Sequence, residues 1–181
     1  MSRNVEIPTS SPHTSFICHW VDETDDERAE IASRIRHLPK PVVTTGGVFD
    51  ILHRGHVSYL NEARSLGASL VVLVNSNRST QLLDKGPGRP INSEEDRAFL
   101  LASLKCVSGV VVFDQTTPNS ALKSIKPDLF VKGGDYEEAQ IRAVDLEGLD
   151  DTKVGKMHFV SGFSTTSIVT RLLSAHNTDA K

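Results

Sequence analysis

The sequence predicts an α/β domain in which a doubly wound, parallel sheet of five strands carries helices on both faces. Five apolar runs alternate along the chain with segments of helical periodicity. Each run is apolar along its whole length rather than at every second residue, which is typical of parallel strands buried on both faces. The length of 181 residues, 38% of them hydrophobic, suits one Rossmann-like domain with one core.

The first elements precede the sheet. Residues 1–22 are polar and rich in Ser, Thr and Pro, so we expect a flexible N-terminal arm. Thr24 and Glu27 have the spacing of a capping box, and apolar residues follow at helical intervals until Pro39. The predicted divisions are an arm over 1–22, a leading helix over 24–38, and a single domain over 23–181 with its core in 41–173.

Each of the five strands is expected to lead into a helix. The predicted strands cover 41–46, 69–75, 109–113, 128–133 and 156–160. The predicted helices cover 57–66, 93–104, 118–125, 137–146 and 165–173. A loop of about 15 residues joins the second strand to its helix, which is long enough to suggest a function. Ligands of doubly wound sheets bind at the carboxyl ends of the strands, so functional residues are expected just after each strand.

Composition argues against several classes of function. Lys and Arg number 20 against 23 Asp and Glu, a formal charge of −3, so we expect no nucleic-acid partner. Cys18 and Cys106 form no CxxC motif, which predicts neither a disulfide framework nor a zinc knuckle and fits the reducing cytoplasm. The N-terminus lacks the apolar run of a signal peptide, and no stretch approaches the ~20 apolar residues of a membrane span. We therefore expect a cytoplasmic protein that does not bind membranes.

The stretch TTGGVFDILHRGHVSYL, at the end of the first strand, is the strongest candidate for a ligand site. Gly46 and Gly47 let the backbone turn sharply and let an anion approach the amide groups. The next helix is expected to begin near Gly55, so its unpaired N–H groups and positive dipole end face the same space. His53 and His56, on either side of Gly55, can offer N–H donors to one phosphate.

Two other interpretations of this stretch stay open. Asp50, His53 and His56 could supply three metal ligands, although the strand-to-helix turn argues against it. The histidines could also be packing residues of the core, although two of them on a glycine-rich turn are less easily explained this way. The GxGxxG and GxxxxGK[ST] motifs are absent, which removes the main support for dinucleotide-binding and P-loop folds.

The long loop after the second strand carries candidate cations. Lys85 and Arg89 flank Gly-Pro-Gly, a segment that can close two positive charges over a polyphosphate. A solvated basic loop is the alternative. Arg97, in the first turns of the following helix, is expected either to reach the same cavity or to pair with an acid such as Glu94.

The ends of the fourth and fifth strands add further candidates. Gly133 and Gly134 allow close backbone approach, or simply form a turn, and Asp135 can contact a ribose, a base or Mg²⁺. At the last helix, at least one hydroxyl is expected to be the N-cap, and the others can join the helix dipole in binding phosphate. These hydroxyls belong to Ser164, Thr165 and Thr166.

The segment His53-Arg54-Gly55-His56 resembles the HxGH signature of a nucleotidyltransferase superfamily. Within that superfamily the chain is most similar to the heptose 1-phosphate adenylyltransferase branch. The similar segments occur in order over roughly 41–173 and are FDILHRGHVSYLNEARSLG, LVNSNRST, KGPGRPIN, DLFVKGGDY and FSTTSIV. Several motifs in order are far more specific than HxGH alone.

The resemblance implies that ATP and D-glycero-β-D-manno-heptose 1-phosphate react to give ADP-heptose and pyrophosphate, for lipopolysaccharide core biosynthesis. It also implies Mg²⁺ held mainly by the ATP phosphates, and a homo-oligomer. The implied catalytic residues are His53, His56 and Lys85. The implied sugar-phosphate contacts are Asp50 and Asn75. The implied nucleotide or phosphate contacts are Gly46, Gly47, Val48, Phe49, Gly55, Arg89, Arg97, Lys132, Gly133, Asp135, Ser164, Thr165 and Thr166.

Two alternative functions stay open. The chain could be a cytidylyltransferase that acts on glycerol phosphate or a similar small phosphate. It could also be a regulatory module that binds a nucleotide and catalyses nothing, although the presence of both histidines and Lys85 argues against that.

Overall fold

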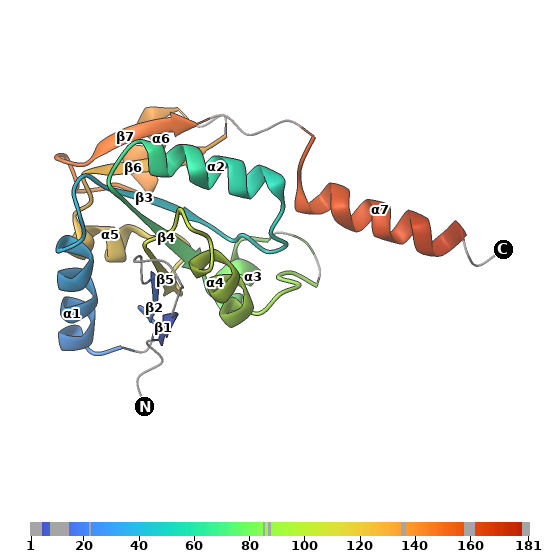
Figure 1. Cartoon of the computed structure of the whole chain (residues 1–181), viewed down its shortest axis with the longest axis horizontal. Coiled ribbons are helices and arrows are strands. Elements are labelled where there is room, and N and C mark those ends of the chain that lie inside the picture. Colours follow the sequence, from blue (N-terminus) through green and yellow to red (C-terminus); the bar gives the residue numbers. More distant parts are fainter. Residues whose placement is uncertain are drawn as a thin grey trace.

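The computed structural model describes residues 5–7, 15–21, 23–84, 86, 88–134, 137–157 and 162–178. Within these residues seven strands form one sheet, in the order β1-β2-β5-β4-β3-β6-β7 (Figure 1). Neighbouring strands pair in parallel, except β1 and β2, which are antiparallel. The strands are β1 Val5–Ile7, β2 Ser15–His19, β3 Val42–Gly47, β4 Ser69–Asn75, β5 Gly109–Phe113, β6 Leu129–Gly133 and β7 Lys153–Met157.

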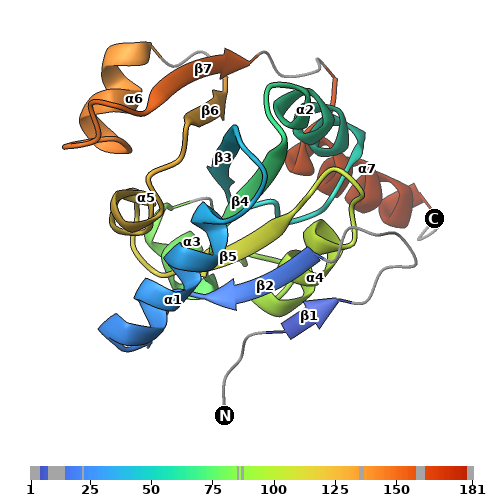
Figure 2. The ribbon, with the colours of Figure 1, turned by 60° about the vertical axis from the view of Figure 1, so that its left-hand side comes forward.

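The winding of the sheet changes direction at β3. The chain passes from β3 to β4 and β5 on one side, then returns to place β6 and β7 on the other side. Figure 2 shows the resulting twisted sheet, with β1 and β2 at one end and β6 and β7 at the other. The carboxyl ends of strands leave a crevice at such a switch point. The predicted doubly wound α/β fold is therefore confirmed, and its five predicted strands correspond to β3–β7.

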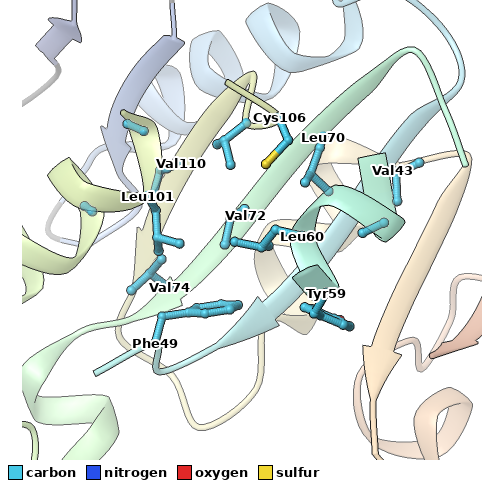
Figure 3. Close-up of a cluster of buried hydrophobic side chains, with 14 of the residues drawn as sticks. Val43, Phe49, Tyr59, Leu60, Leu70, Val72, Val74, Leu101, Cys106 and Val110 are labelled. Atoms are coloured by element: carbon cyan, nitrogen blue, oxygen red, sulfur yellow. The ribbon is translucent and has the colours of Figure 1, made fainter. Parts of the chain in front are cut away.

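Helices cover both faces of the sheet. Leu60 of α2 and Leu101 of α4 pack with Val72 on one face (Figure 3). Ile35 of α1 and Leu122 of α5 belong to the core of the opposite face. None of the helices in the described part of the chain is long and apolar enough to cross a membrane. The helices are α1 Asp25–Arg36, α2 Arg54–Ser65, α3 Asn77–Leu82, α4 Glu94–Ala102, α5 Asn119–Ile125, α6 Glu138–Val144 and α7 Thr165–Thr178.

The prediction of a flexible arm over residues 1–22 was wrong for the segments that form β1 and β2. β2 pairs with β5, and Phe16 of β2 and Trp20, just after it, are both buried. Gly109 of β5 provides the space, because a Cβ there would lie 2.4 Å from Cζ of Phe16. The sheet therefore has two more strands than the five predicted. The arm was predicted from the polar composition of residues 1–22 as a whole, and this concealed a strand of only five residues.

The leading helix is confirmed, whereas one short helix was missed. Thr24 and Glu27 form the predicted capping box of α1, with the Glu27 N–H donating to Thr24 Oγ1 at 3.3 Å. The loop predicted after β4 contains α3, whose N-cap hydroxyl on Ser76 accepts from the Ser79 N–H at 2.9 Å. The predicted last strand begins earlier, at Lys153, and residues 158–160 lie outside the described part of the chain.

Candidate active site

A cavity of about 450 Å³ opens at the carboxyl ends of β3, β4, β5 and β6, beside the switch point of the sheet. Elements from both halves of the chain contribute to its wall. The lining residues are Gly46, Gly47, Val48, Phe49, Asp50, His56, Tyr59, Asn75, Thr80, Leu83, Arg89, Phe113, Thr116, Pro118, Lys132, Gly133, Asp145, Thr165 and Thr166.

The last residues of β3, Gly46 and Gly47, and the turn that follows them as far as Phe49 (together the glycine turn) form one wall of this cavity. A Cβ on Gly47 would lie 3.1 Å from Cε2 of Phe49, so a larger residue there would crowd the ring of Phe49. Phe49 has a φ of 50°, in the left-handed region that non-glycine residues rarely adopt. Its ring joins the core under α2 (Figure 3). The turn thereby brings main-chain atoms of Gly46 and Gly47 to the cavity wall.

The two histidines of the HRGH motif stack at the start of α2. Their ring centroids lie 3.7 Å apart, and the ring planes are 15° from parallel. His53 is the N-cap: its Nδ1 accepts from the His56 N–H at 3.3 Å, so the neutral ring carries its proton on Nε2. Gly55 leaves room for this arrangement, because a Cβ there would lie 3.0 Å from Nδ1 of His53.

Burial favours the uncharged form of both rings. Desolvation lowers the pKa of His56 to about 4. Charge repulsion from His53 also lowers this pKa, whereas the Ile51 carbonyl raises it. Desolvation also lowers the pKa of His53. A neutral imidazole keeps one N–H, so each ring can donate one hydrogen bond without carrying a positive charge.

Asp50 anchors the loop that precedes α4. Its Oδ1 accepts from the N–H groups of Ile91 and Asn92 at 2.8 and 2.9 Å, and its Oδ2 pairs with the guanidinium of Arg89. The Asn92 side chain also donates to the Asp50 carbonyl at 2.6 Å. The carboxylate therefore joins the glycine turn to the loop and holds Arg89 at the cavity wall.

Arg97 is expected from the sequence either to reach the cavity or to pair with an acid, and in the structure its guanidinium bonds to the surrounding backbone instead. Its side chain is 1% exposed and does not line the described cavity. Its guanidinium donates to the carbonyls of Val48 and Asn75, both at 2.7 Å. The other two hydrogen bonds go to the Asn92 carbonyl at 3.1 Å and the Asn77 side chain at 3.0 Å. Arg97 therefore ties together the backbone around the cavity instead of facing a ligand.

The β6 side of the cavity contains an ion pair and a buried phenol. Lys132 Nζ lies 2.5 Å from a carboxylate oxygen of Asp145. The Tyr59 hydroxyl bonds with Thr45 and donates to the Val131 carbonyl at 3.2 Å. Burial raises the pKa of Tyr59 to about 12, so this phenol stays neutral.

The start of α7 closes another side of the cavity. Ser164 acts as the N-cap, since its hydroxyl accepts from the Ser167 N–H at 3.0 Å. Thr165 and Thr166 line the cavity, and Ser164 is exposed. The expectation that one hydroxyl caps this helix is confirmed.

The structure brings most of the predicted site residues to one cavity. Four of the described candidates do not line it, namely His53, Gly55, Arg97 and Ser164, although His53 stacks on a residue that does. Lys85 and Asp135 lie outside the described residues. Seven lining residues were not predicted: Tyr59, Thr80, Leu83, Phe113, Thr116, Pro118 and Asp145. Of these, Thr116 and Pro118 follow a predicted strand, so the strand-end rule alone could have found them.

The described residues contain no cluster of three or more His, Cys, Asp or Glu side chains that could hold a metal ion. Asp50 and Asp145, the two carboxylates among the described lining residues, each pair with a cation. This donor set suits a metal bound mainly by the oxygens of a polyphosphate ligand rather than by the protein.

The chain has relatives of known sequence and structure. The cytidylyltransferase-like family matches residues 44–171. The D-beta-D-heptose 1-phosphate adenylyltransferase of Bordetella bronchiseptica is 53% identical over 112 residues, 61% of this chain and 69% of that protein. The bifunctional protein HldE of Aliarcobacter butzleri is 45% identical over 150 residues, 83% of this chain. The chain spans only 30% of the length of that bifunctional protein.

The fold is shared with solved structures, of which we describe one. The lipopolysaccharide core biosynthesis protein from Thermoplasma volcanium GSS1 superimposes with a TM-score of 0.55 at 28% sequence identity. The match covers 66% of this chain and 95% of that one.

We expect Arg97→Met to destabilise the fold. The substitution leaves buried acceptors without donors, and we expect it to lower the free energy of unfolding by about 3 kcal/mol. Chemical denaturation followed by circular dichroism measures the change. Arg78→Met is the matched control, because Arg78 is exposed and forms a surface pair with Asp114. Equal stability of the two variants would contradict the bracing role of Arg97.

Proposed function

The chain belongs to the cytidylyltransferase-like family of nucleotidyltransferases, and on that premise we propose that it is an adenylyltransferase. It transfers AMP from ATP to D-glycero-β-D-manno-heptose 1-phosphate, in the cytoplasm, and forms ADP-heptose for lipopolysaccharide core biosynthesis. The observation that carries the proposal is the position of His56. Its neutral ring lies at the N-terminus of α2, in the wall of a cavity that also exposes the backbone of two glycines. The choice of sugar follows the relative from Bordetella bronchiseptica.

The proposed reaction needs alignment and charge stabilisation rather than a side-chain base. The phosphate oxygen of the sugar is already an anion when it attacks the α-phosphorus of ATP. One P–O bond forms as the bond to pyrophosphate breaks, and negative charge moves onto the leaving group. His53 and His56 donate to these oxygens, and the positive end of α2 faces them. Lys85 is the third proposed catalytic residue and closes over the polyphosphate from its loop.

The two substrates occupy different sides of the cavity in this proposal. Lys132 and Gly133 at the end of β6, with Thr165 and Thr166 at the start of α7, bind the nucleotide; Asp135 joins them. Asn75, at the end of β4, contacts the sugar phosphate. Support comes from the positions of the described residues on the wall of one cavity. Asp50 contributes by holding Arg89 and the adjoining loop, because its carboxylate oxygens already accept three hydrogen bonds from that loop.

Mg²⁺ is the proposed cofactor, bound mainly by the phosphate oxygens of ATP. When bound, it neutralises part of the triphosphate charge. The carboxylates of Asp50 and Asp145 support this assignment. Each already forms an ion pair with a cationic side chain, so neither is expected to be a main ligand of the metal ion.

Pyrophosphate release tests the proposed function. Purified protein with MgATP is offered a panel of sugar 1-phosphates and glycerol 3-phosphate, and the panel is repeated with CTP. We expect pyrophosphate only from ATP with the heptose 1-phosphate. Release from CTP with glycerol phosphate would support the cytidylyltransferase alternative instead. Tight ATP binding with no release from any acceptor would support the non-catalytic module.

His56→Ala tests the proposed donor. Loss of one donor to the charge that develops in the transition state should lower kcat on the order of 10² to 10³-fold. The substitution should leave the circular dichroism spectrum unchanged, because His56 caps no helix end. His37→Ala is the matched control, since His37 is an exposed histidine at the end of α1. Turnover of His56→Ala close to that of wild type would remove His56 from the catalytic set.

We propose further that the chain forms a homo-oligomer through α7. Leu172 and Leu173 are 63% and 60% exposed, and Ile168 and Val169 continue their apolar stripe at helical spacing. The distal half of α7 extends away from the sheet (Figure 1). A solvent-facing apolar stripe of this kind is typical of an interface between copies.

Light scattering after size exclusion tests self-association. We expect wild type to elute as an oligomer and the double variant Leu172→Glu/Leu173→Glu to elute as a monomer with unchanged helix content. Arg171→Glu, on the same helical turn, is the control for added negative charge. A monomeric wild type would rule out the proposed interface.

A further inference from the structure

The geometry points to Asp145 as a positioning residue that fixes the Lys132 ammonium at the nucleotide side of the cavity. The inference rests on the proposed function, because Lys132 is there assigned to the nucleotide. The two charged groups lie 2.5 Å apart, and both residues line the cavity. Their side chains differ in exposure, at 23% for Lys132 and 4% for Asp145. Of the two side chains, that of Lys132 is therefore the more accessible to a ligand.

Asp145 is well suited to hold another side chain because its own backbone is fixed. It is the C-cap of α6, and its N–H donates to the Ile141 carbonyl at 2.8 Å. Its carbonyl accepts from the side-chain amide of Asn119 at 3.1 Å, and the same amide reaches the Glu147 carbonyl at 3.1 Å. Asn119 is the first residue of α5 and follows Pro118, which lines the cavity. The carboxylate thus extends from a junction of two helices.

Lys132 needs such a partner because of its length. A lysine ammonium ends a flexible chain with many rotamers, and binding a phosphate requires one of them. The backbone of Lys132 is fixed, because this residue is the partner of Lys156 in the pairing of β6 with β7. The pair with Asp145 then restricts the remaining freedom of the side chain before ligand binds, which lowers the entropic cost of binding.

The charge of Asp145 argues against direct contact with phosphate. A carboxylate repels a polyanion, and desolvating it without a cation would be costly. The negligible exposure of Asp145 also leaves little of its surface for a ligand. Its effect on nucleotide transfer should therefore pass through Lys132, which distinguishes a positioning residue from a contact residue.

A double-mutant cycle tests the inference in the full chain. The variants are Asp145→Asn, Lys132→Met and the double variant, assayed for kcat and KM with MgATP and, separately, for the Kd of MgATP by calorimetry. We expect Asp145→Asn alone to raise KM and Kd for ATP about tenfold with a smaller change in kcat. In the Lys132→Met background the same substitution should change neither value.

Glu138→Gln is the matched control, because Glu138 forms an ion pair with Arg142 on the outer surface of the same helix. This variant should bind ATP like wild type. Two results would overturn the inference and assign Asp145 to stability alone. One is an effect of Asp145→Asn that is equally large with and without Lys132. The other is ATP binding by Asp145→Asn equal to that of Glu138→Gln.

The same data separate this inference from the proposed function. If wild type releases no pyrophosphate but the Kd values show the expected dependence on Lys132, the proposed function fails and the positioning role stands. If wild type is active and Asp145→Asn matches the control, the positioning role fails and the proposed function stands.

Discussion

A guanidinium buried under the carboxyl edge of the sheet holds the candidate active site in shape. Arg97 donates to the last carbonyl of β4 at Asn75 and to the glycine turn at Val48. Its other donors reach Asn77 in α3 and Asn92 in the loop before α4. Three parts of the chain, at Val48, at Asn75 to Asn77 and at Asn92, are thereby fixed relative to one another before a ligand arrives. Such preorganisation is what stabilisation of a developing charge requires, because the donors then need not reorient during the reaction.

Charge in the described part of the cavity is balanced before a nucleotide binds. Arg89 pairs with Asp50, and Lys132 pairs with Asp145. Burial favours the neutral form of His56. Recognition of a polyanion then depends on N–H groups in fixed positions more than on net charge, in agreement with the slight negative charge of the whole chain. A cavity of this kind favours ligands whose oxygens match the donors in position, since unpaired cations would attract any phosphate.

Residues whose roles depend on local conformation could be predicted from the sequence. Gly47 and the HRGH segment make contacts with residues two or three positions away in the sequence. His53, for example, is the N-cap of α2 and accepts from the His56 N–H. Asp50 and Arg97 could not be resolved this way. Asp50 bonds to an amide 41 positions along the chain, and Arg97 bonds to a carbonyl 49 positions back. Whether the side chains of Asp50 and Arg97 contact a ligand or the backbone depends on how distant loops fold against each other. Asp145 lies at the end of a helix with no motif of its own, and the fold alone puts it beside Lys132.

The pairing of β2 with β5 also has a consequence for the protein during its synthesis. Synthesis runs from the N-terminus, so β2 leaves the ribosome long before β5, its partner in the sheet. The exposed edge of β5 would otherwise invite strands from other chains. Phe16 is already available when Gly109 emerges, and its ring fits the space that the glycine leaves. Because its partner strand β2 has already been synthesised, the edge of β5 is exposed for only a short time to other chains near the ribosome.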